Sequence, residues 1–191
     1  MPLIETPLNV TPREYELAVK SILDGAGLGL TDFKSTHLEK VDGVDGSYAI
    51  DVTARFSALG ADFLVLVECK CEQRKIERQA VQILHDKVRS TGAQKGMLFS
   101  VSGFQDGAIE YADVHGIALV QLANGSSSWF TKSIGPTTPP PPWANIPEYI
   151  GWWCHGNSMS VMSSEIGEYT REVLGVQHLL KVDSHGPPSR G

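Results

Sequence analysis

The feature that most constrains the fold is a pair of strand-like segments between residues 48 and 70. The first shows the period-two alternation typical of a β-strand, with apolar or small side chains at Tyr48, Ile50, Val52, Ala54 and Phe56. The second, residues 63–70, is apolar on both faces until its end, so we expect other elements to cover it on both sides. Because only a short turn around residues 58–61 separates them, the two segments predict an antiparallel hairpin.

Helix and strand patterns flank this hairpin on both sides. A helix is expected to start at Thr11, because Thr is a good N-cap, Pro12 suits the first helical position and Glu14 completes a capping box. Gly25 would end this helix. Residues 42–47 read as a loop. After the hairpin, the spacing predicts a helix over 74–90 closed by Gly92, a strand over 97–101, a helix over 105–114 and a strand over 117–122. This order predicts an α/β domain with a mixed sheet flanked by helices.

A polyproline segment divides the chain. Residues 136–143 include four consecutive prolines and form an extended spacer that neither a helix nor a central strand can absorb. We therefore predict one domain over residues 1–135, a linker over 136–143 and a C-terminal accessory segment over 144–191. The tail is rich in tryptophan, and we expect packing rather than base stacking from Trp143, Trp152 and Trp153.

Composition narrows the class of protein. The chain has 191 residues, of which 41% are hydrophobic, so it can build a core. No apolar run approaches the roughly 20 residues of a membrane-spanning helix, and residues 1–7 do not resemble a secretory signal. Three cysteines argue against a disulfide framework, so a reducing compartment, by default the cytoplasm, is expected.

The net charge of −6 argues against a protein that coats nucleic acid through its charge alone. It does not argue against a nuclease whose acidic residues hold a divalent cation. The charge is also uneven, because residues 70–90 contain six basic and three acidic side chains. Within this segment, phosphate contacts are expected from Arg74, Lys75 and Arg78, with help from Gln79; an ordinary solvated helix face is the alternative.

The hairpin register places two carboxylates together. If the turn is centred between Leu59 and Gly60, the numbers of paired residues sum to 119, which puts Val52 opposite Val67 and Asp51 opposite Glu68. Directly opposed residues have Cβ atoms about 4.5–5.5 Å apart. Two carboxylates at that separation repel each other unless a proton or a cation lies between them.

These residues suggest metal-assisted hydrolysis of a phosphodiester. Lys70 follows Glu68 by two positions and should project from the same face, whereas Cys69 should point with Ile50 to the apolar face. An oxygen-only pair such as Asp51 and Glu68 suits Mg²⁺, and the backbone carbonyl of Cys69 is a candidate third ligand. Lys70 would orient or deprotonate the attacking water. A solvated surface ion-pair patch is the alternative interpretation.

A zinc site is a weaker hypothesis. Cys69 and Cys71 could combine with Cys154 and His155, but the spacing matches no recognised zinc motif. Buried thiols are the simpler interpretation. The other histidines are scattered and show no useful spacing to a cysteine or serine.

The same residues resemble the PD-(D/E)xK, or restriction-endonuclease-like, nuclease superfamily, and most of all its Mrr-like branch. The resemblance covers residues 11–122 and is carried by Tyr15-Glu16, Ile50-Asp51-Val52, Val67-Glu68-Cys69-Lys70, Ser102-Gly103-Phe104, Ala108, Ala112 and Gly116-Ile117. It implies a mixed central sheet with an αβββαβ-type core. It also implies an endonuclease that cuts DNA with Mg²⁺, for which Mn²⁺ can substitute.

The resemblance also implies roles and partners. Asp51 and Glu68 would bind the metal, Lys70 would be the catalytic lysine and Glu16 an accessory acid. The chain departs from the family where Gly-rich acidic residues precede Asp51, which leaves Asp45 as a competing first metal acid. A role in restriction or anti-phage defence is implied, and cleavage of both DNA strands would require a homodimer, a larger assembly or a partner subunit. The alternative is a non-catalytic module of the same fold that binds nucleic acid or a protein.

Overall fold

A computed structural model describes residues 8, 10–125, 146–155 and 158–165. In these ranges the elements are, in chain order, α1 (Pro12–Gly27), β1 (Thr31–Gly43), β2 (Gly46–Ala58), β3 (Ala61–Lys70), α2 (Arg78–Thr91), β4 (Lys95–Ser100), α3 (Asp106–His115), β5 (Ala118–Asn124), β6 (Tyr149–His155) and β7 (Ser158–Ser163). The αβββαβ core that the sequence suggested is present.

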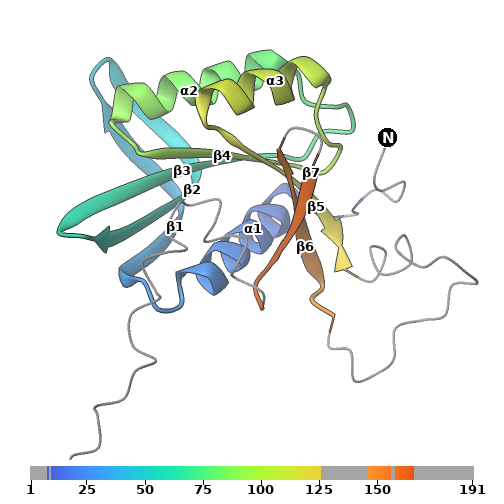
Figure 1. The fold of residues 1–191 in the computed structure, drawn as a ribbon, viewed down its shortest axis with the longest axis horizontal. Helices are drawn as coiled ribbons and strands as arrows, with labels where there is room; N and C mark the ends of the chain where they lie inside the picture. Colours follow the sequence, from blue (N-terminus) through green and yellow to red (C-terminus); the bar gives the residue numbers. More distant parts are fainter. Residues whose placement is uncertain (1–7, 9, 126–145, 156–157, 166–191) are drawn as a thin grey trace, which may run out of the picture.

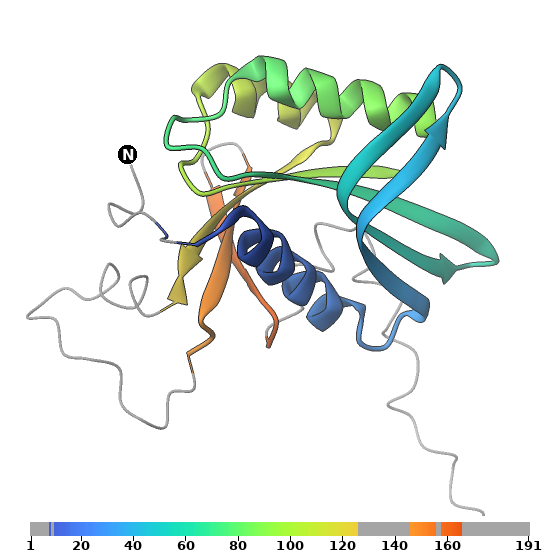
Figure 2. The same cartoon turned by 180° about the vertical axis from the view of Figure 1, so that it is seen from behind.

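One mixed sheet organises the molecule. Its strand order follows the chain from β1 to β7. The pairs β1–β2 and β2–β3 are antiparallel, β3–β4 and β4–β5 are parallel, and β5–β6 and β6–β7 are antiparallel. Helix α1 covers one face, and α2 and α3 lie side by side on the other (Figure 1; the reverse view is Figure 2). The mixed sheet with helices on both faces is thus confirmed.

Two apolar clusters, one on each face, account for this arrangement. On one face, Val52, Val67 and Phe99 pack against the buried side of α1, which includes Tyr15 and Val19. On the other face, the strand residues Leu66 and Leu98 pack with Leu84 of α2 and Ala108 of α3. Strand β3 contributes to both clusters, which is why its segment is apolar on both faces.

Helix α1 begins as the sequence predicts. The Thr11 side chain accepts a hydrogen bond from the Glu14 backbone N–H, and the Glu14 carboxylate accepts one from the Thr11 backbone N–H at 2.8 Å. The predicted end at Gly25 is wrong, because the helix continues to Gly27. Both glycines are closely packed: a Cβ at Gly27 would overlap the Phe33 ring.

The hairpin register is confirmed where the strands pair. Val52 lies opposite Val67, Ala54 opposite Val65 and Phe56 opposite Phe63. The rings of Phe56 and Phe63 are stacked with centroids 5.1 Å apart. The turn uses two left-handed residues, Leu59 at φ 53° and Gly60 at φ 77°, as a tight hairpin turn requires.

Several predicted boundaries are wrong. Helix α2 starts at Arg78 rather than at residue 74, because the chain before it is held in a loop by a parallel bridge between Ile76 and Phe104. Residues 42–47 form a tight hairpin turn rather than a loop, since Asp42 still pairs with Ser47. Gly92 closes α2 in a left-handed conformation, as expected.

The alternation of apolar and polar residues predicts no strand where β1 lies. This strand is an edge strand of mostly exposed or half-buried residues, and charged side chains such as Lys34, Glu39 and Lys40 obscure any alternation. Edge strands commonly carry such charges, which oppose unwanted pairing.

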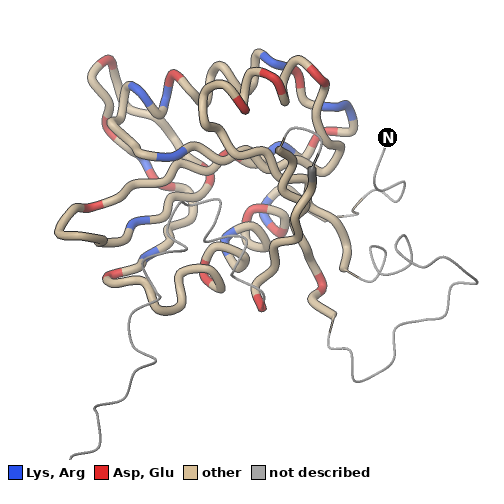
Figure 3. Tube along the Cα trace, viewed as in Figure 1, with Lys and Arg blue, Asp and Glu red and all other residues tan. Residues whose placement is uncertain are grey.

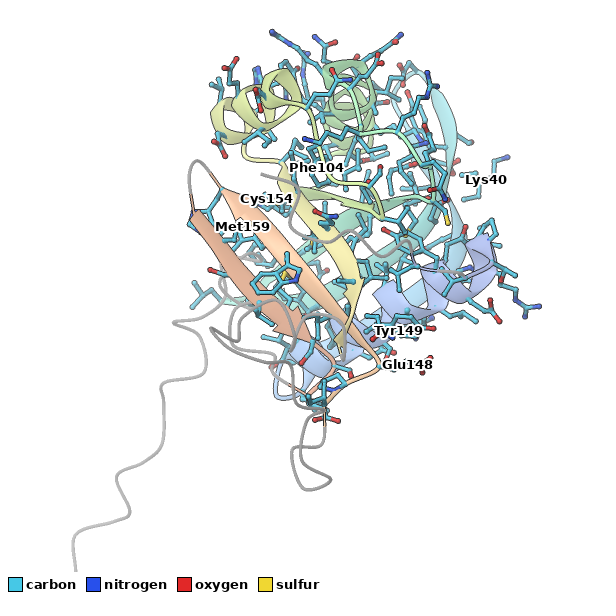
Figure 4. The ribbon with its side chains drawn as sticks, turned by 90° about the vertical axis from the view of Figure 1, so that its right-hand side faces the viewer. Lys40, Phe104, Glu148, Tyr149, Cys154 and Met159 are labelled. Carbon is cyan, nitrogen blue, oxygen red and sulfur yellow. The ribbon has the colours of Figure 1, made fainter. Side chains whose placement is uncertain are left out.

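The segment after the gap extends the same sheet. β6 pairs with β5, and Trp152 and Ile150 pack against Ala123 of β5. Strands β6 and β7 contain no Lys, Arg, Asp or Glu, so both are tan in Figure 3. Figure 4 faces the β6–β7 hairpin, with Tyr149 near its start and Cys154 beside Met159 near its turn. The expected packing role of Trp152 is confirmed. The linker, residues 136–143 with Trp143, lies outside the described ranges. The division into a domain and an accessory segment stays a prediction.

Within the described ranges, no helix is both long and apolar enough to cross a membrane. The three cysteines, Cys69, Cys71 and Cys154, are free thiols.

The contact between α1 and the end of β7 can be tested at Gly25. A Cβ there would overlap the backbone carbonyl of Ser164, so Gly25→Ala should destabilise the protein by about 1–3 kcal/mol. The matched control is Gly107→Ala in α3, where a Cβ meets open space. It should be neutral or stabilising by up to about 1 kcal/mol. Thermal or urea unfolding measures both; equal stability of the two variants would contradict the packing of β7 on α1.

Candidate functional site

The candidate site lies where β2 and β3 stop pairing. The last paired residues are Val52 and Val67, and Asp51 is the next residue of β2. Its Oδ2 atom accepts a hydrogen bond from the Cys69 backbone N–H at 2.7 Å. Asp51 is therefore attached to the backbone of β3 between Glu68 and Lys70.

The strand β2 bends at this point. Ile50 packs in the cluster on the α2–α3 face, whereas Val52 packs on the α1 face, although the two residues are separated by one position. Cys69 lies on the α1 side, so the prediction that Cys69 and Ile50 share a face is wrong. On β1, Leu38 has φ 53° and lies between His37 and Glu39, which pair with Val52 and Ile50. This irregularity beside Asp51 agrees with a local break in the pleat.

Glu68 is a buried carboxylate with a cation against it. The residue is 8% exposed, and its Oε1 atom accepts a hydrogen bond from Lys87 Nζ at 2.6 Å. Burial raises the pKa of Glu68, and the hydrogen bond and charge of Lys87 oppose that rise. The charge of Asp51 raises the pKa further, and that of Lys70 lowers it. Asp51 and Lys70 are therefore close enough to Glu68 for their charges to act on it.

Glu16 reaches the same region from α1. Its Oε2 atom lies 2.6 Å from His37 Nε2 of β1, and both side chains are largely buried. Burial raises the pKa of the Cys69 thiol well above its ordinary value, and the negative charges of Asp51, Glu16 and Glu68 raise it further. The three predicted acids are thus close enough to Cys69 for their charges to act on its thiol, and Lys70 is the next residue.

A groove leads away from Lys70 along the start of α2. Its volume is about 400 Å³, and it is lined by Lys70, Glu72, Arg74, Lys75, Ile76, Glu77, Gln79, Ala80 and Ile83. Three of the four residues expected to contact nucleic acid are among them. The fourth, Arg78, lies instead with its guanidinium over the Tyr111 ring of α3, 5.0 Å from the centroid.

The donor set fits a hard divalent cation. Among the described residues, no hydrogen bond occupies Asp51 Oδ1 or Glu68 Oε2, so each carboxylate keeps one oxygen for an ion. Carboxylate oxygens are the ligands that Mg²⁺ prefers, and it commonly takes only one or two of them together with water and substrate phosphate. No cluster of three or more His, Cys, Asp or Glu side chains suited to a metal occurs in the described ranges. The Cys69 carbonyl stays a predicted third ligand.

The competing assignments find less support. Asp45 lies in the turn between β1 and β2, where it accepts hydrogen bonds from the hydroxyls of Tyr48 and Ser90. Glu14, the alternative to Glu16 as the accessory acid of the first helix, is engaged in its capping box. Cys69 and Cys71 pack on the α1 face and Cys154 on the other, so the zinc arrangement is not assembled.

Sequence reasoning missed Lys87 and His37. Lys87 lies on the same face of α2 as Ala80, Leu84 and Val88, which pack on the sheet. It is therefore a lysine in an otherwise apolar helix face. That signal was available. The partner of His37 depends on how β1 pairs, and this strand had no readable pattern.

The family assignment rests on one comparison. A restriction endonuclease family model, Mrr_cat, matches residues 7–125. No curated protein matches the chain. A crystal structure of a protein of unknown function, AF1548, is 15% identical with a TM-score of 0.44, over 56% of this chain and 55% of that one, so the chain spans about half of that protein's length. Because the family model covers more than half of the sequence, the chain belongs to the restriction endonuclease family with the Mrr-type catalytic domain.

Proposed function

We propose that the protein is a Mg²⁺-dependent DNA endonuclease that hydrolyses phosphodiester bonds, with Mn²⁺ able to substitute. The observation that carries this proposal is that Asp51 and Glu68 lie just beyond the last paired residues of β2 and β3, close enough for their charges to interact, and that each has one carboxylate oxygen unoccupied by the described residues. Lys70 follows Glu68 on the same strand and borders the groove of about 400 Å³ along the start of α2.

Each residue has a role that its position permits. Asp51 and Glu68 would hold the metal, which when bound polarises the phosphodiester and stabilises developing negative charge. The Cys69 N–H orients Asp51, and Lys87 orients Glu68. Lys70 would position the attacking water or take its proton. Glu16, held by His37, would act as an accessory acid at the edge of the site.

The groove would guide the DNA strand to Lys70. Arg74 and Lys75 offer charges for phosphates, and Gln79 offers an amide for hydrogen bonds. Arg78 could contact DNA only from the outer side of α2, since it stacks on Tyr111. These few cations must act against a net charge of −6.

The biological setting we propose is restriction or anti-phage defence in the cytoplasm. A duplex has two strands, so a single site would nick it and a homodimer, or a complex with a partner subunit, would be needed to cut both. A non-catalytic module that binds nucleic acid or a protein is the second candidate. The Lys87–Glu68 ion pair favours this second candidate, because Lys87 neutralises the Glu68 carboxylate without a metal.

Plasmid nicking separates these candidates. The wild-type protein should nick plasmid with Mg²⁺ or Mn²⁺ and lose that activity when the metal is chelated. Asp51→Asn, which keeps an acceptor for the Cys69 N–H, should reduce nicking to background, and Lys70→Ala should reduce it at least about 100-fold.

Asp45→Asn is the matched control and should leave nicking unchanged. Loss of activity in Asp45→Asn but not in Asp51→Asn would transfer the metal role to Asp45. DNA binding without nicking under any metal condition would favour the non-catalytic module, and equal nicking by all variants would indicate a contaminating nuclease.

The groove predicts a specific salt dependence. If Lys75 contacts a phosphate, Lys75→Ala should reduce the slope of log affinity against log salt by about 1. The control is Arg89→Ala, which removes one charge from the last turn of the same helix. Fluorescence anisotropy with labelled DNA measures both slopes; an equal reduction in the two variants would assign the effect to general charge rather than to the groove.

A further inference from the structure

The contact between Lys87 and Glu68 differs from two other ion pairs of Lys and Arg within the part of the chain that the structure describes. Its two side chains are 18% and 11% exposed, whereas the pairs Lys20–Asp24 and Arg55–Glu39 have side chains between 27% and 45% exposed. Exposed pairs contribute little to stability. A nearly buried pair is different, because removing one partner leaves an uncompensated charge out of water.

The location of Lys87 sets its effect on the site. It comes from α2 and occupies only Oε1 of Glu68, whereas Asp51 is held by the Cys69 N–H of β3. The second oxygen stays available. The ammonium therefore fixes the carboxylate in place, but it also leaves a positive charge against a group expected to bind a cation.

The charges next to the site cancel. Asp51 and Glu68 contribute two negative charges, and Lys70 and Lys87 contribute two positive ones. Glu16 has its own partner in His37. A divalent cation that enters between Asp51 and Glu68 meets no net negative charge from these two acids and the two lysines, and two cations on the two oxygens of one carboxylate repel each other.

We propose that Lys87 is a built-in counter-cation of Glu68. It holds the carboxylate in position when no metal is bound and weakens metal binding to the free protein, so that the metal is retained only when a DNA phosphate adds negative charge. This inference rests on the proposed function. By linkage, DNA should tighten metal binding by the same factor by which metal tightens DNA binding.

The test is a direct measurement of Mn²⁺ affinity, by titration calorimetry or by the electron-paramagnetic-resonance signal of free Mn²⁺. Lys87→Met should bind Mn²⁺ at least about 10-fold more tightly than the wild type, because the repelling charge is gone. A short duplex with phosphorothioate linkages should tighten Mn²⁺ binding at least about 10-fold for the wild type. Its effect on Lys87→Met should be smaller.

Three controls make the result specific. Arg89→Met removes the same charge from the same helix away from the site and should change Mn²⁺ affinity less than about twofold. Lys87→Gln keeps a hydrogen-bond donor without the charge, so it tests the same expectation if the methionine variant unfolds. Adding Asp51→Asn to Lys87→Met should abolish the gain.

The outcomes distinguish this inference from the proposed function. If Asp51→Asn weakens Mn²⁺ binding but removal of the Lys87 charge leaves it unchanged or weaker, the metal site stands and the counter-cation role is wrong. A merely structural role for Lys87 gives that result, since loss of packing can only weaken the site. If Mn²⁺ binds no variant, with or without DNA, the proposed metal-dependent nuclease is itself wrong.

Discussion

The burial of Glu68 beside a second carboxylate is the constraint on which the site depends. Strand β3 is covered on both faces, so Glu68, although it is close to the end of the strand, stays largely out of water. An isolated buried carboxylate costs several kcal/mol. The structure compensates with an ammonium on Glu68 and a backbone N–H on Asp51. These two contacts determine which oxygens remain for an ion, and hence where chemistry can occur.

The arrangement of the sheet explains why these groups meet. Strands β2 and β3 are held in register by apolar pairs up to Val52 and Val67, and their separation beyond that point opens space for polar side chains. Parallel pairing of β3 with β4 places the end of β3 beside Ser100, a buried polar residue at the end of β4. Helix α1 then supplies Glu16 from one face of the sheet, and α2 supplies Lys87 from the other.

The sequence predicts the centre of this site better than its surroundings. Asp51 and Glu68 could be placed together because period-two pleating and a short turn leave one register that buries the apolar face. Residues that meet through long-range packing could not. Lys87 stands out in the sequence as a lysine in an apolar helix face, but its contact with Glu68 depends on how α2 lies on the sheet. His37 reaches Glu16 through β1, an edge strand whose charged residues hide its pattern. The bend at Asp51, which separates Ile50 from Val52, also has no signal in the residue types.

The net negative charge of the chain is compatible with the proposed DNA cleavage, because the charges near the site matter more than the total charge. At physiological salt, charges farther away than about 8 Å are largely screened. A DNA strand bound in the groove, as proposed, would therefore respond mainly to the nearest lysines and arginines rather than to the net charge of −6. At the centre of the site, the carboxylates of Asp51 and Glu68 are matched by the amines of Lys70 and Lys87, so this centre has little attraction for a lone cation or a lone phosphate. A cation and a phosphate that enter together neutralise each other. An acidic protein with a balanced site is thus suited to bind metal and DNA jointly and neither of them strongly alone.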